Sequence, residues 1–187
     1  MVDEASRACA RALHVLQEIG ELTTLESSEP VCAPAGVQVF RVCRDALTSG
    51  IVPDGGQSPA FICADGDSPA LVDGNAAWLM RAFTALMAAT AREHGTGTLE
   101  CHGFVSDHGD QPSAVIAFGS TGFASTRESL VTDRRAFDRW RGGTGLSLPI
   151  ACRIIEAHGG SVWSPAGAGA RTSVWNLPLA RVSQAGS

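Results

Sequence analysis

The chain has 187 residues, of which 44% are apolar and 18% charged, with a formal net charge of −5 and a pI near 5.5. This length and composition suit one globular domain, or one domain with a short extension, and exclude a disordered chain. No apolar run approaches the roughly 20 residues of a membrane-spanning helix, and the acidic balance argues against a general nucleic-acid binder.

The residue types present narrow the chemistry further. All 14 basic residues are arginine, so a P-loop lysine, a Schiff-base lysine and a kinase-type strand lysine are impossible. The six cysteines are scattered and no two stand in a Cys-x-x-Cys spacing, which favours buried reduced thiols over a metal site. The N-terminus lacks the charge and apolar order of a signal peptide, so we expect a cytoplasmic protein.

An amphipathic helix is expected over residues 4–25. Its apolar residues step by three and four positions, the heptad spacing, and this row includes Val15, Ile19 and Leu22. A second apolar row runs beside it, so the helix needs more than one neighbour. Packing on its own domain and packing in an intermolecular bundle both remain open.

Composition and periodicity divide the chain into four parts. We expect a helix resembling a dimerisation helix over 1–28, a Pro-containing linker over 29–36, a folded domain over 37–180 and a polar tail over 181–187.

Helices and short strands alternate within the folded domain. Periodicity predicts helices over 37–48, 75–93 and 147–158, whereas 128–141 is helical or loop-like. The strand candidates are 60–64, 70–73, 98–105, 113–118, 161–163 and 172–177. This order predicts an α+β fold, a two-layer sandwich with helices on one face of a mixed sheet, preceded by the N-terminal helix.

The most informative segment is GGTGLSLPIACRIIEAHGG, residues 142–160. Its first glycines free the backbone for close approach to a ligand or for a mobile lid. A helix begins directly afterwards, so its N-terminal amides point back at the glycine turn, an arrangement that suits a polyphosphate. By itself, such a turn often does no more than cap a helix.

The whole segment resembles the G2 box of the histidine-kinase-type ATPases, the GHKL family, in which G-x-G-L-G-L precedes an amphipathic helix and E-x-H-G-G. FDRW at 137–140 resembles the family's aromatic F box before the lid. The helix at 75–93 stands in the place of the N box, and GSTGFA at 119–124 in the place of the G1 box. The resemblance covers residues 33–180, and the sensor-kinase branch fits best.

This resemblance implies a site for ATP and Mg²⁺. Ser120 and Gly122 would face the adenine. The phosphates would lie against the glycine turn and the start of the next helix, formed by Gly142, Gly143, Thr144, Gly145 and Leu146.

The chain departs from the family pattern at the residues that bind Mg²⁺ and adenine in the family. Aligned on its apolar residues, the N box has Ala89 at the Mg²⁺-binding Asn and Ala85 at the preceding motif Asn, with Arg92 in the same degenerate box. An alanine offers no oxygen to a hard cation. Ser120 replaces the adenine-reading Asp, and losing a charge-assisted hydrogen bond costs on the order of 1.5–3 kcal/mol. His14 also lacks the residues of the family's phospho-accepting box. The sequence therefore assigns no catalytic residue and no metal ligand.

Three functions remain open. The first is a pseudokinase in two-component signalling that docks on a histidine kinase, a response regulator or a second copy of itself, with weak or no binding of ATP and Mg²⁺. Its docking residues would be Phe137, Trp140, Val15, Ile19 and Leu22. The second is an active ATP-dependent histidine kinase domain. The third is a serine kinase resembling anti-sigma factors. We expect neither nucleic acid as a partner nor insertion into a membrane.

Overall fold

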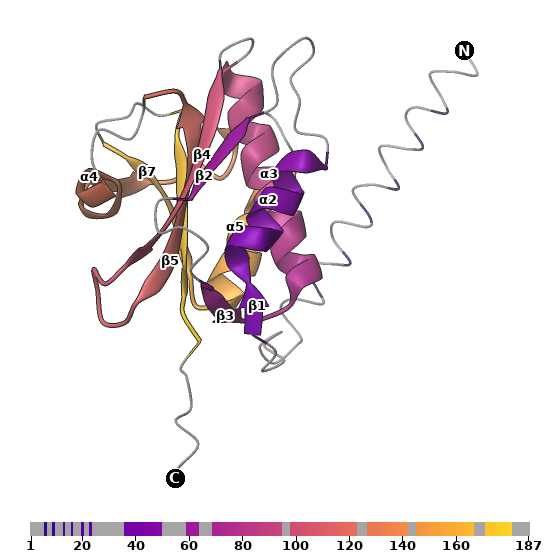
Figure 1. Cartoon of the computed structure of the whole chain (residues 1–187). Coiled ribbons are helices and arrows are strands. Elements are labelled where there is room, and N and C mark those ends of the chain that lie inside the picture. The colour runs from indigo at the N-terminus through magenta and orange to yellow at the C-terminus, as the bar shows by residue number, and fades with distance from the viewer. Residues whose placement is uncertain are drawn as a thin grey trace.

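The computed structural model describes residues 36–49, 59–63, 69–94, 98–122, 127–141, 145–166 and 171–180, together with six positions between 6 and 23 (Figure 1). Those six positions are helical and exposed, as expected for the N-terminal helix; they are Ser6, Cys9, Leu13, Leu16, Gly20 and Thr23. Val15, Ile19 and Leu22 lie outside the described residues, as does the tail. The predicted division into four parts stays a prediction.

A six-stranded sheet with the order β2-β4-β5-β8-β7-β6 forms the centre of the domain. Its strands in that order are Ala60–Cys63, Leu99–Ser106, Ser113–Ser120, Ser173–Pro178, Ser161–Pro165 and Arg134–Ala136. The β2–β4 pair is parallel and the other pairs are antiparallel, so the sheet is mixed. β1 (Gly36–Gln38) and β3 (Leu71–Asp73) form a separate antiparallel pair.

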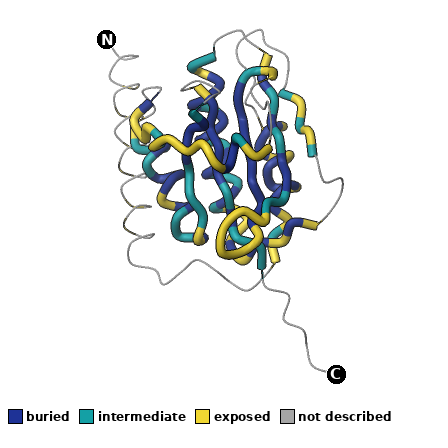
Figure 2. The backbone as a smooth tube through the Cα atoms, turned by 90° about the vertical axis from the view of Figure 1, so that its left-hand side faces the viewer, coloured by how far each residue is buried: buried dark blue, intermediate teal, exposed yellow. Residues whose placement is uncertain are grey.

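Three helices cover one face of this sheet: α2 (Val39–Thr48), α3 (Ala76–His94) and α5 (Ser147–Ala157) (Figure 1). The main core lies between them and the sheet, where the Phe83 ring of α3 lies 5.5 Å from the Trp175 ring of β8. Burying one such large apolar side chain stabilises the fold by about 1.5–3 kcal/mol. Figure 2 shows this buried layer enclosed by exposed loops and outer helix faces.

The short helix α4 (Arg127–Thr132) lies on the opposite face of the sheet (Figure 1). Its Leu130 and Val131 belong to a second, smaller core with side chains of β4, β5, β7 and β8. The Trp163 indole nitrogen of β7 donates a hydrogen bond to the Leu130 carbonyl, 2.7 Å away. The segment that the sequence left as helical or loop-like is therefore α4 followed by the edge strand β6.

Local interactions explain where α3 and α5 begin and end. The Asn75 side-chain oxygen accepts hydrogen bonds from the Ala77 and Trp78 amides at 2.9 and 3.2 Å, which caps α3. At the end of α5, Gly159 adopts a φ of 74°, and the Gly160 amide donates to the Ile155 carbonyl. A left-handed glycine of this kind ends many helices, so the sequence pair Gly159-Gly160 acts as the predicted stop.

The predicted α+β class and its mixed sheet are confirmed, with one shift at the start of the domain. The predicted helix over 37–48 begins at Val39, because Val37 and Gln38 pair with β3 instead. Among the described residues, no helix combines the length and apolar character needed to cross a membrane.

Candidate functional site

The candidate site lies at the end of the sheet where β5 ends and β8 begins. Phe118 of β5 pairs with Ser173 of β8, and Ser120 ends β5 two residues later. Phe118 belongs to the core that contains α3, and alternate residues of a strand share a face. Ser120 therefore lies on the helix-covered side. Gly122 follows in a turn at a φ of 77°, a conformation that favours glycine.

The N-box positions lie on the helix facing this end of the sheet. Ala89 is fully buried within the main core, and Ala85 is partly buried against it. Arg92 is exposed, and its side chain bonds back to the Ala88 carbonyl at 3.4 Å. The position expected to bind Mg²⁺ therefore holds a methyl group packed among apolar side chains. These residues do not fit a magnesium ion, which needs oxygen ligands.

Part of the glycine turn can be placed. Gly145 adopts a left-handed φ of 64°, and Leu146 packs against the main core directly before α5. The N-cap residue of α5 is Leu146, whose apolar side chain makes no capping hydrogen bond. Gly142, Gly143 and Thr144 lie outside the described residues.

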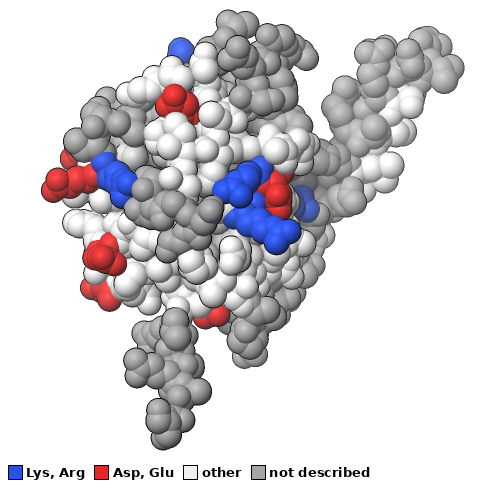
Figure 3. All heavy atoms as spheres, viewed as in Figure 1, with Lys and Arg blue, Asp and Glu red and all other residues white. Residues whose placement is uncertain are grey.

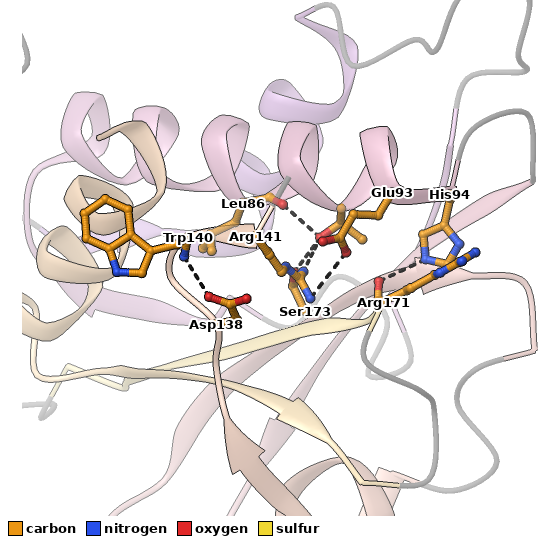
Figure 4. A network of polar contacts seen from close by, with 9 residues as sticks. Leu86, Glu93, His94, Asp138, Trp140, Arg141, Arg171 and Ser173 are labelled. Atoms are coloured by element: carbon orange, nitrogen blue, oxygen red, sulfur yellow. Dashed lines mark hydrogen bonds and ion pairs between the residues drawn. The ribbon is translucent and has the colours of Figure 1, made fainter. Parts of the chain in front are cut away.

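A buried arginine occupies the centre of the site (Figure 4). Arg141 directly precedes the glycine turn, and only 8% of its surface is exposed. One guanidinium nitrogen donates to the Thr90 hydroxyl of α3 at 2.8 Å and also to the Ser173 hydroxyl of β8. The other terminal nitrogen lies 3.7 Å from the Glu93 carboxylate of α3. One side chain thus joins α3, β8 and the segment before the glycine turn.

The protons of this cluster can be assigned from its partners. The Thr90 hydroxyl lies 2.9 Å from the Leu86 carbonyl, which can only accept, so Thr90 donates there. Ser173, whose oxygen is 2.5 Å from that of Thr90, then donates to Thr90. Both hydroxyl oxygens keep lone pairs that accept from Arg141. The site is therefore arranged around a positive charge.

The groups around Arg141 favour a charged guanidinium inside the fold. Burial lowers the pKa of Arg141, while the Glu93 and Asp138 carboxylates act in the opposite direction. An arginine stays protonated at any physiological pH. The guanidinium carbon also lies 4.5 Å from the centre of the Phe137 ring, a cation–π contact. On α5 nearby, burial raises the pKa of the Cys152 thiol to about 11.

The two aromatic residues predicted to dock a partner point in different directions. Phe137 is partly buried and packs against the main core, so it belongs to the interior. Trp140 is 68% exposed and points away from the arginine cluster in Figure 4. Its backbone amide donates to the Asp138 carboxylate at 2.9 Å. Only Trp140 of this pair offers a contact surface.

Trp140 has charged neighbours in the chain, and one of them, Arg139, pairs with a carboxylate of α5. Arg139 lies 2.5 Å from the Glu156 carboxylate, and Arg153 lies 3.6 Å from it. On the face seen in Figure 3, arginine side chains form small separate groups, and acidic side chains border the largest of them. This pattern is unlike the continuous basic surface typical of nucleic-acid binders.

A second polar cluster lies at the other end of α3. The His158 Nδ1 lies 2.7 Å from the Ile154 carbonyl, so Nδ1 carries the proton. Its Nε2 then accepts a hydrogen bond from the backbone N–H of Asn75 at 3.2 Å. Burial lowers the pKa of His158, although the bond to Ile154 acts in the opposite direction. The histidine of the G2-like segment is thus a neutral link between α5 and the start of α3.

The arginine cluster is the part of the site that sequence reasoning missed. Thr90 lies within the degenerate N box, Glu93 follows it, and Ser173 is the first residue of β8. The available signal was a polar residue, Thr90, between two alanines on an apolar helix face. That signal does not name its partner, because Arg141 is 51 residues away.

Comparison with known proteins identifies the fold. No protein-family model matches the chain, and no curated protein matches it significantly in sequence. The structure of full-length ShkA in complex with AMPPNP matches 93% of this chain and 39% of its own, at 19% identity and a TM-score of 0.56. The fold is that of a histidine-kinase catalytic domain.

Two solved histidine kinases also match, at lower TM-scores. The mycobacterial sensor histidine kinase MprB matches 78% of this chain and 97% of its own, at 18% identity and a TM-score of 0.48. The Acinetobacter baumannii histidine kinase AdeS matches 90% of this chain and 78% of its own, at 15% identity and the same TM-score of 0.48. At identities this low, the activity has to be argued from the residues of this chain.

Proposed function

We propose that this protein is a degenerate histidine-kinase-like domain that acts in two-component signalling by binding a partner protein, with weak or no binding of ATP. One observation carries the proposal. Ala89, at the expected Mg²⁺ position, is fully buried, and the next turn of the same helix already binds the guanidinium of Arg141.

The charge of this guanidinium disfavours a magnesium ion at the N-box position. A magnesium ion near Ala89 would find no oxygen from that residue and would face the positive charge of Arg141. The Glu93 carboxylate is already ion-paired with the arginine. Phosphoryl transfer relies almost entirely on positioning and charge neutralisation, so these residues are poorly suited to it.

One observation favours the alternative of an active, ATP-binding kinase domain. Gly145 has a left-handed φ, and α5 begins two residues later with its N-terminal amides directed toward the glycine turn. Such amides suit phosphate groups. This alternative predicts measurable affinity for nucleotide without a magnesium ligand from α3.

A titration of the purified full chain with Mg²⁺-ATP separates the two functions. We expect no saturable heat and no change in tryptophan fluorescence up to several millimolar nucleotide, where Trp140 is the exposed reporter beside the glycine turn. Micromolar binding, together with ATP turnover that a Gly145→Val variant abolishes, would establish the active kinase instead. Binding that persists in Gly145→Val would place the nucleotide elsewhere on the protein.

Among the described residues, the most exposed large apolar side chains offer a partner protein two features. One is Trp140 with its neighbouring Arg139, and tryptophan and arginine are the residues that most often dominate binding energy at interfaces. The other is the N-terminal helix, where Leu13 and Leu16 are 65% and 64% exposed. A second copy of the chain is therefore one candidate partner, together with a histidine kinase or a response regulator.

Light scattering after gel filtration tests self-association. If the helix joins two copies, the full chain runs as a dimer, and a Leu13→Glu/Leu16→Glu variant runs as a monomer with an unchanged circular dichroism spectrum. A Trp140→Ala variant is the matched control for the other surface. A monomeric wild-type chain would direct the search to a different protein partner.

A further inference from the structure

Two buried cysteines meet where α2 packs on the sheet. The sulfur atoms of Cys43 on α2 and Cys101 on β4 are 3.5 Å apart, although 58 positions separate the residues in the chain. Both thiols are free and both side chains are fully buried. We propose that Cys43 and Cys101 form a reversible disulfide, a modification site that ties the first helix of the domain to its central sheet.

The surrounding packing explains why the two sulfur atoms lie so close. Gly103 follows Cys101 by two positions on β4, so both residues face α2. A Cβ atom added at Gly103 would lie 3.0 Å from the Phe40 ring of α2 and 3.0 Å from the Phe61 ring of β2. Phe40 and Cys43 share one face of the helix at a spacing of three. The missing side chain at Gly103 thus allows the helix backbone to approach the strand.

Forming the bond brings the two sulfur atoms closer together. A disulfide holds its sulfur atoms about 2.05 Å apart, so the present separation of 3.5 Å must close by about 1.5 Å. Both cysteines belong to the main core, and α2 also packs against α3 and β2. The bond would therefore link two side chains that are already neighbours.

The reaction requires an oxidant, for which a small disulfide such as oxidised glutathione suffices. One cysteine thiolate attacks the small disulfide, which forms a mixed disulfide and releases one small thiol. The second cysteine then displaces the other small thiol. In total, the protein gives up two electrons and two protons, and the oxidant becomes two thiols. A reducing thiol reverses both steps.

Burial slows the oxidation of these two cysteines. Burial raises the pKa of Cys101, and its contact with Cys43 raises it further, so the reactive thiolate is scarce in the closed fold. Attack therefore requires a local opening of α2 from the sheet. Cys152 is an equally buried thiol on α5, and it provides a comparison because it lies on a different helix.

The experiment uses the full native chain and oxidised glutathione over several hours. The protein is then denatured in an alkylating reagent, digested with trypsin without reduction, and examined by mass spectrometry. Because every basic residue is arginine, trypsin places Cys43 in residues 42–44 and Cys101 in residues 93–127, and neither peptide contains another cysteine. A linked pair of these two peptides identifies the bond directly.

We expect this linked pair to form, to disappear with dithiothreitol, and to raise the melting temperature by roughly 5–15 °C. A Cys152→Ala variant should form the same bond, whereas Cys43→Ala and Cys101→Ala should not, and neither should gain stability on oxidation. The proposal is overturned if the two peptides stay unlinked, if either cysteine links to a different one, or if the linked protein melts at a lower temperature.

Discussion

The two ends of α3 are held by buried polar clusters of opposite character. At its start, the backbone N–H of Asn75 donates to the neutral His158 ring, and the side chain of Asn75 caps the helix. In its last turns, Thr90 and Glu93 hold the charged Arg141 together with Ser173 of β8. Both clusters join α3 to segments far away in the chain, one through a neutral ring and the other through a full charge.

This difference decides how much stability the protein loses when one partner of each cluster is removed. A neutral imidazole carries a moderate desolvation penalty, which its two hydrogen bonds offset. A buried guanidinium carries a much larger penalty, which the hydrogen bonds to Thr90 and Ser173 and the ion pair with Glu93 must offset. Changes at the charged cluster should therefore have larger effects than changes at the neutral one.

The largest effect is expected from Arg141→Met, which keeps the aliphatic stem and removes the charge. Thr90 and Ser173 lose a shared donor, and the Glu93 carboxylate loses its ion pair. Removing one partner of a buried pair costs about 3 kcal/mol, which lowers the melting temperature by roughly 6–12 °C in a domain of this size. Chemical unfolding in urea measures the change.

Arg139→Met is the matched control for that substitution. Arg139 forms a short ion pair with Glu156, but its side chain is 49% exposed, and exposed pairs contribute about 0–1 kcal/mol. Similar losses in the two variants would mean that burial of Arg141 adds nothing. A gain in ATP affinity in Arg141→Met alone would show that the guanidinium keeps nucleotide out.

Gly74→Ala, at the neutral cluster, is expected to cause an intermediate loss of stability. A Cβ atom there would lie 2.3 Å from Cδ2 of the His158 ring, which is itself buried between two helices and cannot move aside. Such overpacking costs about 1–3 kcal/mol. Gly36→Ala is the control, since its Cβ would meet Leu71 at an ordinary 3.6 Å. Urea unfolding that leaves both variants equally stable contradicts a rigid histidine link.

These two clusters also mark what the sequence could predict. His158 of the neutral cluster lies within the G2-like pattern, and the glycine pair after it correctly predicted the end of α5. The apolar periodicity around Phe83 likewise predicted α3 and its buried face. Such signals are local, because each residue's role follows from its neighbours along the chain.

The charged cluster and the division of the aromatic pair needed three-dimensional information. Nothing in FDRWR shows that Arg141 turns inward and Trp140 outward, since that choice depends on acceptors supplied by Thr90 and Ser173. The small core beneath α4 escaped prediction for the same reason: Leu130 and Val131 are too few to define a face until Trp163 lies opposite them. The sequence shows an alanine at the position expected to bind Mg²⁺, and that stays a prediction, whereas the buried guanidinium of Arg141 could not be predicted.

The smallest effect is a pH dependence from His158. Because burial lowers its pKa, the unfolded chain binds a proton near pH 6.5 while the folded chain stays neutral. The unfolded state therefore holds more protons below that pH, and the free energy of unfolding falls as the pH falls, by at most about 1.4 kcal/mol per pH unit. Protonation of Nε2 would also break its bond to the Asn75 amide.

Urea unfolding of wild type, His158→Gln and His108→Asn between pH 7.5 and 5.5 isolates this contribution. His108 lies in the exposed turn between β4 and β5, so its replacement should leave the slope unchanged. His158→Gln should flatten the curve over this range, even if it lowers the overall stability. An unchanged slope in His158→Gln would mean that the ring titrates alike in both states, and that the neutral cluster does not depend on an uncharged histidine.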